Sequence, residues 1–181
     1  MSLNFIKLLT RKAPELPEGC TWINSAEPLS LQKLKWHVVI LDFWSCYDKN
    51  GMNSLPLMSA IASKYRKDPV VVIGVHSSKA SARRPLGNIT SAAQAKGIRY
   101  PIVVDKGMRI WHRYFVTEHP TTVVVGPNER IAFKLAGECS LEQMSRLIDD
   151  AMDDARRSGT LARKRISIRM PEAKSRPGNL M

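Results

Sequence analysis

One segment of the sequence places a thiol at the junction of a strand and a helix. Residues 42–56 read DFWSCYDKNGMNSLP, in which an apolar strand runs into a turn and then into a helix, with Cys46 near the junction. A cysteine beside a helix N-terminus is favoured as the thiolate, the form that attacks disulfides and is readily oxidised. Turnover also needs a second thiol to resolve the mixed disulfide, and Cys20 and Cys139 lie far from Cys46 in the sequence. Two interpretations of Cys46 stay open: a reactive thiol, or a small buried residue.

The remaining cysteines and histidines do not indicate a metal site. The three cysteines and four histidines are scattered, and their spacing matches neither metal ligands nor a disulfide framework. Unpaired cysteines are typical of a reducing compartment. We therefore expect no metal, no cofactor and no disulfide.

Strands and helices alternate around this segment. Continuous apolar runs at 37–44 and 69–75 predict strands buried on both faces of a sheet, joined by a helix over 52–67. A right-handed crossover through that helix makes the two strands parallel. Ser140 and Gln143 form a capping box at the start of the last helix. The other predicted elements are a helix at 91–98, a strand at 100–104, a short helix at 107–115, a hairpin of strands at 120–126 and 130–137, and a helix at 140–157.

Positive charge is concentrated at the two ends of the chain. The first 13 residues carry a net charge of +3 and residues 158–181 carry +5, out of +12 for the whole chain. Basic arms of this kind suit a polyanion such as RNA, an acidic membrane surface or an acidic protein face, although they also occur as solubilising tails. The candidate polyanion-binding residues are Arg163, Lys164, Arg165, Arg169, Lys174 and Arg176.

The chain accordingly divides into three parts. Residues 1–13 form a basic amphipathic extension with Leu3, Ile6 and Leu9 at helical spacing, which resembles a mitochondrial presequence. A folded domain is expected over 14–157, followed by a basic tail over 158–181 that the core does not need. No apolar run is long enough to span a membrane.

Residues 14–150 resemble a thioredoxin-like domain of the TlpA/ResA type, and most closely the thioredoxin-like domain of NHL-repeat-containing proteins. The segments that carry the resemblance are WINSAEPLSLQKLKWHVVILDFW, KYRKDPVVVIGVHSSK, GIRYPIVVDKGMRIWHRYFV and HPTTVVVGPNERIAFKLAGE. The resemblance implies an α/β thioredoxin-like fold, a mixed sheet flanked by helices, with basic N- and C-terminal extensions. It also implies that Pro120 is cis and faces the active-site loop.

The same resemblance implies that both redox cysteines are replaced. Family members carry Phe-Trp, three residues, Cys, two residues, Cys and then four residues before a helix proline. Counted from Trp44 to Pro56 without a gap, this spacing places the two cysteine positions on Asp48 and Gly51, and Cys46 on neither. No catalytic residue is therefore expected. Asp48 is expected to cap the helix that follows, for about 1 kcal/mol.

The resemblance further implies a peptide-binding groove that is retained although the redox cysteines are replaced. Its residues are Tyr47, Asp48, His119, Pro120 and Thr121, and in the family the backbone before the cis-proline pairs with an extended peptide. We expect a redox-inactive structural or binding subunit of a large assembly, most of all a mitochondrial ribosome or another ribonucleoprotein with RNA phosphate contacts at the termini. The alternatives are an accessory subunit of a mitochondrial respiratory complex and a thiol-disulfide oxidoreductase that uses Cys46.

Overall fold

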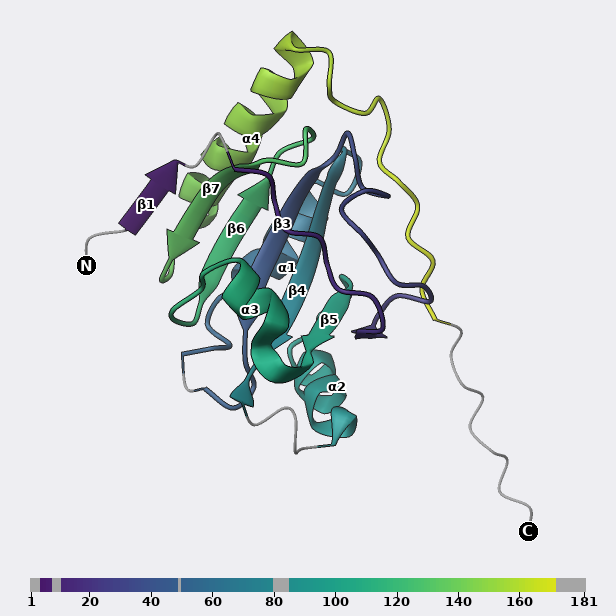
Figure 1. The fold of residues 1–181 in the computed structure, drawn as a ribbon, viewed down its shortest axis with the longest axis vertical. Coiled ribbons are helices and arrows are strands. Elements are labelled where there is room, and N and C mark those ends of the chain that lie inside the picture. Colours follow the sequence, from purple (N-terminus) through teal and green to yellow (C-terminus); the bar gives the residue numbers. More distant parts are fainter. Residues whose placement is uncertain (1–3, 8–10, 49, 80–84, 172–181) are drawn as a thin grey trace.

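A seven-stranded mixed sheet organises the chain (Figure 1). The structure is a computed structural model, and it describes residues 4–7, 11–48, 50–79 and 85–171. The strand order is β1-β7-β6-β3-β4-β5-β2, with β3, β4 and β5 parallel and every other neighbouring pair antiparallel. The strands are β1 (Asn4–Lys7), β2 (Thr21–Ile23), β3 (Val38–Trp44), β4 (Val70–Ser77), β5 (Ile102–Asp105), β6 (Thr121–Val125) and β7 (Ile131–Ala136).

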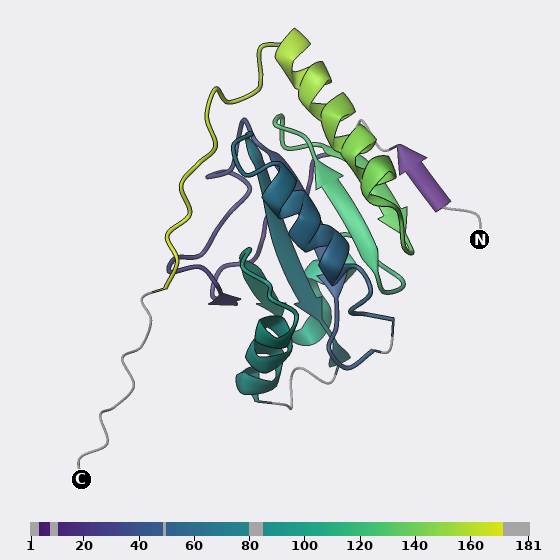
Figure 2. The ribbon, with the colours of Figure 1, turned by 180° about the vertical axis from the view of Figure 1, so that it is seen from behind.

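Helices cover both faces of the sheet, so every residue of β3 and β4 is buried, as the apolar runs predict. Helices α1 (Leu55–Lys64), α2 (Leu86–Ala95) and α4 (Leu141–Arg157) pack on one face, and α1 and α4 stand in front of the sheet in Figure 2. The short α3 (Arg109–Arg113) packs on the other face. None of the helices within the described ranges has the length and apolar character needed to cross a membrane.

The fold class and the capping box of α4 are confirmed. The Ser140 side chain accepts a hydrogen bond from the backbone N–H of Gln143, at 3.1 Å, and the Gln143 side chain accepts one from the backbone N–H of Ser140, at 2.9 Å. Helix α2, by contrast, begins at Leu86, earlier than its predicted start at residue 91. No side chain caps the N-terminus of α2, so the sequence offers no capping signal for its first turn, and the spacing of apolar residues alone does not locate it.

The N-terminal extension is a strand where the sequence predicts a helix. Residues Asn4–Lys7 form β1, which pairs antiparallel with β7 at the edge of the sheet. Leu3 and Leu9, two of the residues at helical spacing, lie outside the described residues. A short isolated helix is marginal in water, whereas the open edge of β7 satisfies the backbone groups of an added strand. The helical expectation for Ile6 is therefore wrong.

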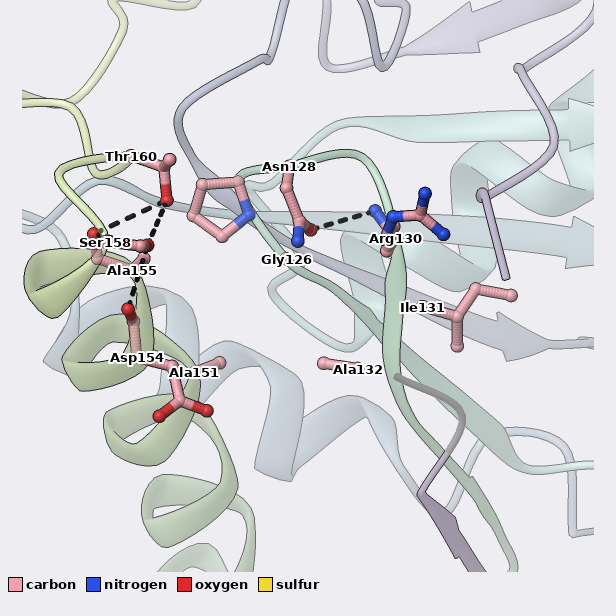
Figure 3. A pocket seen from close by; sticks show the side chains of 11 residues that line it. Gly126, Asn128, Arg130, Ile131, Ala132, Ala151, Asp154, Ala155, Ser158 and Thr160 are labelled. Carbon is pink, nitrogen blue, oxygen red and sulfur yellow. Dashed lines mark hydrogen bonds between the residues drawn. The ribbon is translucent and has the colours of Figure 1, made fainter. Parts of the chain in front are cut away.

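The chain remains packed on the domain beyond the end of α4. The segment 158–171, here called the C-terminal strap, starts at a small pocket of about 90 Å³ between the end of α4 and the β6–β7 turn (Figure 3). There the Ser158 hydroxyl donates to the Asp154 carbonyl at 3.0 Å and lies 2.9 Å from the Thr160 hydroxyl. These bonds turn the chain back toward the sheet.

The C-terminal strap then runs across the end of the sheet at which β3 begins. Ile166 and Ile168 pack against the core on the α3 face, and Leu161 packs against the core on the opposite face. The expectation that the packed core ends at about residue 157 is therefore wrong. Three hydrogen bonds of the backbone hold the strap: Ala162 N–H to the Trp36 carbonyl (2.7 Å), Ile166 N–H to His37 Nε2 (2.9 Å) and Ala26 N–H to the Arg169 carbonyl (2.9 Å).

Candidate functional site

The predicted groove residues come together where β3 ends and β6 begins. These strands are antiparallel neighbours, so the loop after β3 lies beside the loop before β6. Tyr47 and Asp48 belong to the first loop, and His119 and Pro120 to the second, with Thr121 opening β6. The His119–Pro120 peptide bond is cis, as the resemblance implies. The five predicted residues are thus brought together from two sequence-distant loops at one end of the central strands.

Asp48 and His119 connect the two loops across the groove. His119 Nδ1 lies 3.4 Å from Asp48 Oδ2, and the ring of Trp111 packs on the imidazole with centroids 4.6 Å apart. Burial lowers the pKa of His119, while the hydrogen bond and the charge of Asp48 act to raise it. The pKa of Asp48 is lowered, first by the backbone N–H of Asn50 and also by His119.

Asp48 does not cap the helix. Helix α1 begins at Leu55 with Ser54 at its N-cap, and the Ser54 hydroxyl donates to Asp42 at 3.0 Å. The Asp48 carboxylate instead accepts the backbone N–H of Asn50 at 2.9 Å, closing a turn. The prediction of an N-cap is wrong because the chain makes further turns before α1 starts. Asp48 stabilises the loop and holds His119.

Gly51 occupies a position with no room for a side chain. A Cβ on Gly51 would lie 2.5 Å from the backbone carbonyl oxygen of Ser45, well inside van der Waals contact. The loop is drawn in by two backbone hydrogen bonds, from Ser45 N–H to the Gly51 carbonyl (3.3 Å) and from Gly51 N–H to the Asp48 carbonyl (3.1 Å). A cysteine at residue 51 would require the backbone of this loop to move.

Cys46 is hydrogen-bonded to a buried histidine. Its Sγ lies 3.3 Å from His76 Nε2, which also accepts the Cys46 backbone N–H at 3.2 Å. His76 is fully buried at the end of β4, with the ring of Trp44 edge-on at 4.9 Å. Burial lowers the pKa of His76 to about 4. The imidazole is therefore neutral at pH 7. Its Nε2 accepts a hydrogen bond from Cys46, and the ring brings no positive charge that would favour the thiolate.

Sequence reasoning missed Asp42 and His76. Asp42 is fully buried in β3, and its hydrogen-bond partner is the Ser54 hydroxyl. Burial raises the pKa of Asp42 to about 7. The signal for Asp42 is a lone ionisable side chain inside an otherwise apolar run, and His76 directly follows such a run and is still part of strand β4. A strand buried on both faces carries any such residue into the core.

The predicted polyanion residues lie away from the groove. Those in the described part of the chain belong to the C-terminal strap, which crosses the start of β3, whereas the groove lies at its end. Arg163, Lys164 and Arg169 are exposed, and Arg165 is half-buried. Lys174 and Arg176 lie outside the described residues. Over the described ranges, no group of three or more His, Cys, Asp or Glu side chains gathers as metal ligands would.

The contact between Asp48 and His119, here called the bridge, leads to a prediction. Replacing Asp48 by asparagine should lower the pKa of His119 further, because burial then acts without an opposing carboxylate. An NMR titration of the imidazole measures this pKa. Glu129→Gln, which removes a charge from the turn at the other end of β6, should leave it unchanged. An unchanged value in Asp48→Asn would show that the bridge does not act in solution.

Comparison with known proteins agrees with this arrangement. A family model described as thioredoxin-like matches residues 37–131, which include both loops of the groove. NHL repeat-containing protein 2 of Bos taurus is 33% identical over 170 residues, covering 93% of this chain and 23% of that protein. Thiol-disulfide oxidoreductase ResA of Bacillus anthracis is 24% identical over 130 residues, 72% of each chain. The chain thus spans less than a quarter of the NHL-repeat relative.

The solved structures show the same architecture. The crystal structure of a thioredoxin-like superfamily protein superimposes with a TM-score of 0.70 at 21% identity, over 78% of this chain and 96% of that one. At this identity the likeness concerns the fold. With the matching family model, the cis-proline loop and the sheet order in agreement, the chain belongs to the thioredoxin-like family.

Proposed function

We propose that this domain is a partner-binding module that does not turn over disulfides. The observation that carries the proposal is the closed loop at the two positions where the family has its cysteines. Asp48 has no thiol and is engaged with His119, and Gly51 has no room for a Cβ beside Ser45. The remaining features of the site are the polar side chains of Asp48 and His119 next to a cis-proline.

The backbone of the groove is suited to binding an extended peptide. Within the described part of the chain, the backbone N–H and carbonyl of His119 make no hydrogen bond to the protein. An added strand can pair with these groups, and the flanking side chains of Tyr47 and Asp48 then select the residues of the partner. This supports a protein partner rather than a small-molecule substrate.

The first test of the proposal is an insulin-reduction assay with dithiothreitol as the electron donor. We expect no rate above that of dithiothreitol alone, because the second thiol needed to resolve a mixed disulfide is absent from the loop. Cys139→Ser serves as the control, since burial raises the pKa of Cys139 to about 11 and keeps it protonated. Turnover that Cys46→Ser abolishes and Cys139→Ser preserves would overturn the proposal.

Partner capture tests the groove itself. Asp48→Arg places a long side chain in the groove at an exposed position, while Glu142→Arg makes the same charge change on the exposed face of α4. Proteins captured from the native source by the unchanged chain and by Glu142→Arg, but not by Asp48→Arg, are the groove partners. If Asp48→Arg and Glu142→Arg capture the same proteins in equal amounts, the groove is not the binding site.

A second candidate function is thiol chemistry at Cys46. It is favoured by the short contact between Cys46 Sγ and His76 Nε2, at 3.3 Å. The buried, neutral His76 argues against a thiolate at rest. The cysteine variants in the insulin assay separate this candidate from the first.

The larger assembly to which this domain belongs stays a prediction, made from the basic termini. We propose that the partners are protein subunits of a larger assembly, with a mitochondrial ribonucleoprotein preferred to a respiratory complex. Co-sedimentation with and without RNase distinguishes the two, because only a ribonucleoprotein releases the chain when its RNA is digested.

A further inference from the structure

A pocket apart from the groove is lined by two arginines and, among the described residues, by no acid. It has a volume of about 310 Å³ and lies between the last turns of α1, the loop between α2 and β5, and the C-terminal strap. The residues that matter for its chemistry are Ser59, Ser63, Gly97, Arg99, Tyr100 and Arg165.

Neither arginine has a carboxylate partner among the described residues. Arg165 is half-buried, its Nη1 donates to the Arg66 carbonyl at 3.3 Å, and its Nε is buried without a hydrogen-bond partner in the described chain. Burial lowers the pKa of Arg165. A partly desolvated cation without a counter-charge is unfavourable, and an anion in the pocket would compensate it.

The two arginines are not needed to bond the free carbonyls at the C-termini of α1 and α2. The last carbonyls of α2 accept the backbone N–H groups of Lys96, Gly97 and Ile98, at 2.9 to 3.2 Å. At the end of α1, the backbone N–H groups of Tyr65 and Arg66 do the same. The backbone carbonyls at the ends of both helices therefore do not require the guanidinium of Arg99, and Arg165 uses Nη1 on the Arg66 carbonyl while its Nε is buried.

Hydroxyl groups complete the lining. Ser63 is exposed, and its hydroxyl makes no hydrogen bond within the described residues, so it can donate to a ligand in the pocket. The hydroxyls of Ser59 and Tyr100 are buried in the wall without a described partner, and Tyr100 is only 5% exposed. The contacts with a ligand would therefore come from the accessible ends of Arg99, Arg165 and Ser63.

We propose that this pocket binds a phosphomonoester group. Guanidinium groups present planar pairs of N–H donors that match the oxygens of a phosphate, and two of them balance a dianion. The pocket is larger than a phosphate ion, so the ligand carries an organic part that lies over Ser59 and Gly97. The site is independent of the groove, and it gives Arg165 a role distinct from that of the exposed basic residues of the strap.

The test is an NMR titration of the full chain with phenyl phosphate at constant ionic strength. Arg99→Gln and Arg165→Gln should each weaken binding by about tenfold or more, the effect of losing a charge-assisted hydrogen bond. Arg163→Gln removes the same charge from an exposed position of the strap outside the pocket and should change binding less than about twofold. Dimethyl phosphate, a monoanionic diester, should bind more weakly than phenyl phosphate.

Equal weakening by Arg163→Gln and Arg99→Gln, or equal binding of the diester, would overturn the proposal. Arg99 is exposed, so its variant remains informative if Arg165→Gln loosens the strap, and Arg165→Lys should retain the charge but not the paired donors. Titrations with free phosphoserine and with a phosphoserine peptide distinguish the source of the group. Tighter binding of the peptide indicates a phosphorylated protein, and equal binding a small phosphate ester.

Discussion

Replacing Asp42 by asparagine should make the domain more stable than the unchanged protein at pH 8, by up to about 4 kcal/mol. Asp42 is fully buried in β3, and burial raises its pKa from 3.8 to about 7 in the folded state. Between these two pH values the folded chain binds more protons at this residue than the unfolded chain. The contribution of Asp42 to the free energy of unfolding therefore falls as the pH rises from about 4 to about 7, and stays low above it.

The measurement is urea unfolding of both proteins between pH 4 and pH 8, and the quantity of interest is the difference between their free energies of unfolding. Asparagine retains an acceptor for the Ser54 hydroxyl and carries no charge. Near pH 4 the variant should be no more stable than the unchanged protein. A difference that does not vary with pH would show that the Asp42 carboxyl does not titrate in this range.

Asp105 provides a matched control in the neighbouring part of the sheet. It is also buried, but its carboxylate accepts hydrogen bonds from the Ser77 hydroxyl and from the backbone N–H groups of Ile110 and Trp111. An asparagine amide would oppose one of these donors, so Asp105→Asn should lower stability by about 1 to 3 kcal/mol. Comparing the free energies of unfolding of the two variants distinguishes a buried carboxyl with one hydrogen-bond partner from one with three.

Ending the chain at residue 157 should lower the free energy of unfolding by on the order of 3 kcal/mol. Among the contacts that the truncation removes are the three hydrogen bonds of the strap backbone to Ala26, Trp36 and His37, each with a net value of about 1 kcal/mol. It also uncovers the core beneath Leu161, Ile166 and Ile168. His37 is the most affected residue, because its Nδ1 is engaged with the Lys35 carbonyl and its Nε2 would lose the Ile166 N–H.

A chain that ends at residue 171 is the control, since it retains each of these contacts and should unfold at the same denaturant concentration as the full chain. Ending the chain at residue 157 removes a net charge of +5, whereas ending it at residue 171 removes only +1. Measuring both truncations in high salt, which screens exposed charges, separates the loss of packing from the loss of charge. Equal stability of the chain ending at 157 and the full chain would mean that the strap is a tail, as the sequence predicts.

The sequence by itself determined the elements whose signals are local. Unbroken apolar runs predict β3 and β4 because strands buried on both faces need apolar residues throughout, and both are confirmed. The capping box of Ser140 and Gln143 locates the start of α4, since both bonds lie within one turn. The family resemblance implies the cis bond before Pro120, and this bond is confirmed. The replacement of the two redox cysteines and the role of the groove residues stay predictions of that resemblance.

Only the tertiary structure decided where the distant segments meet. Residues 4–7 are a strand because the edge of β7 is open, and the strap is packed because His37 and Trp36 lie beneath it. Asp48 faces His119 rather than the helix because the loop folds inward at Gly51. Each of these outcomes depends on backbone groups and surfaces supplied by another part of the chain, and local periodicity and propensity carry no information about such partners.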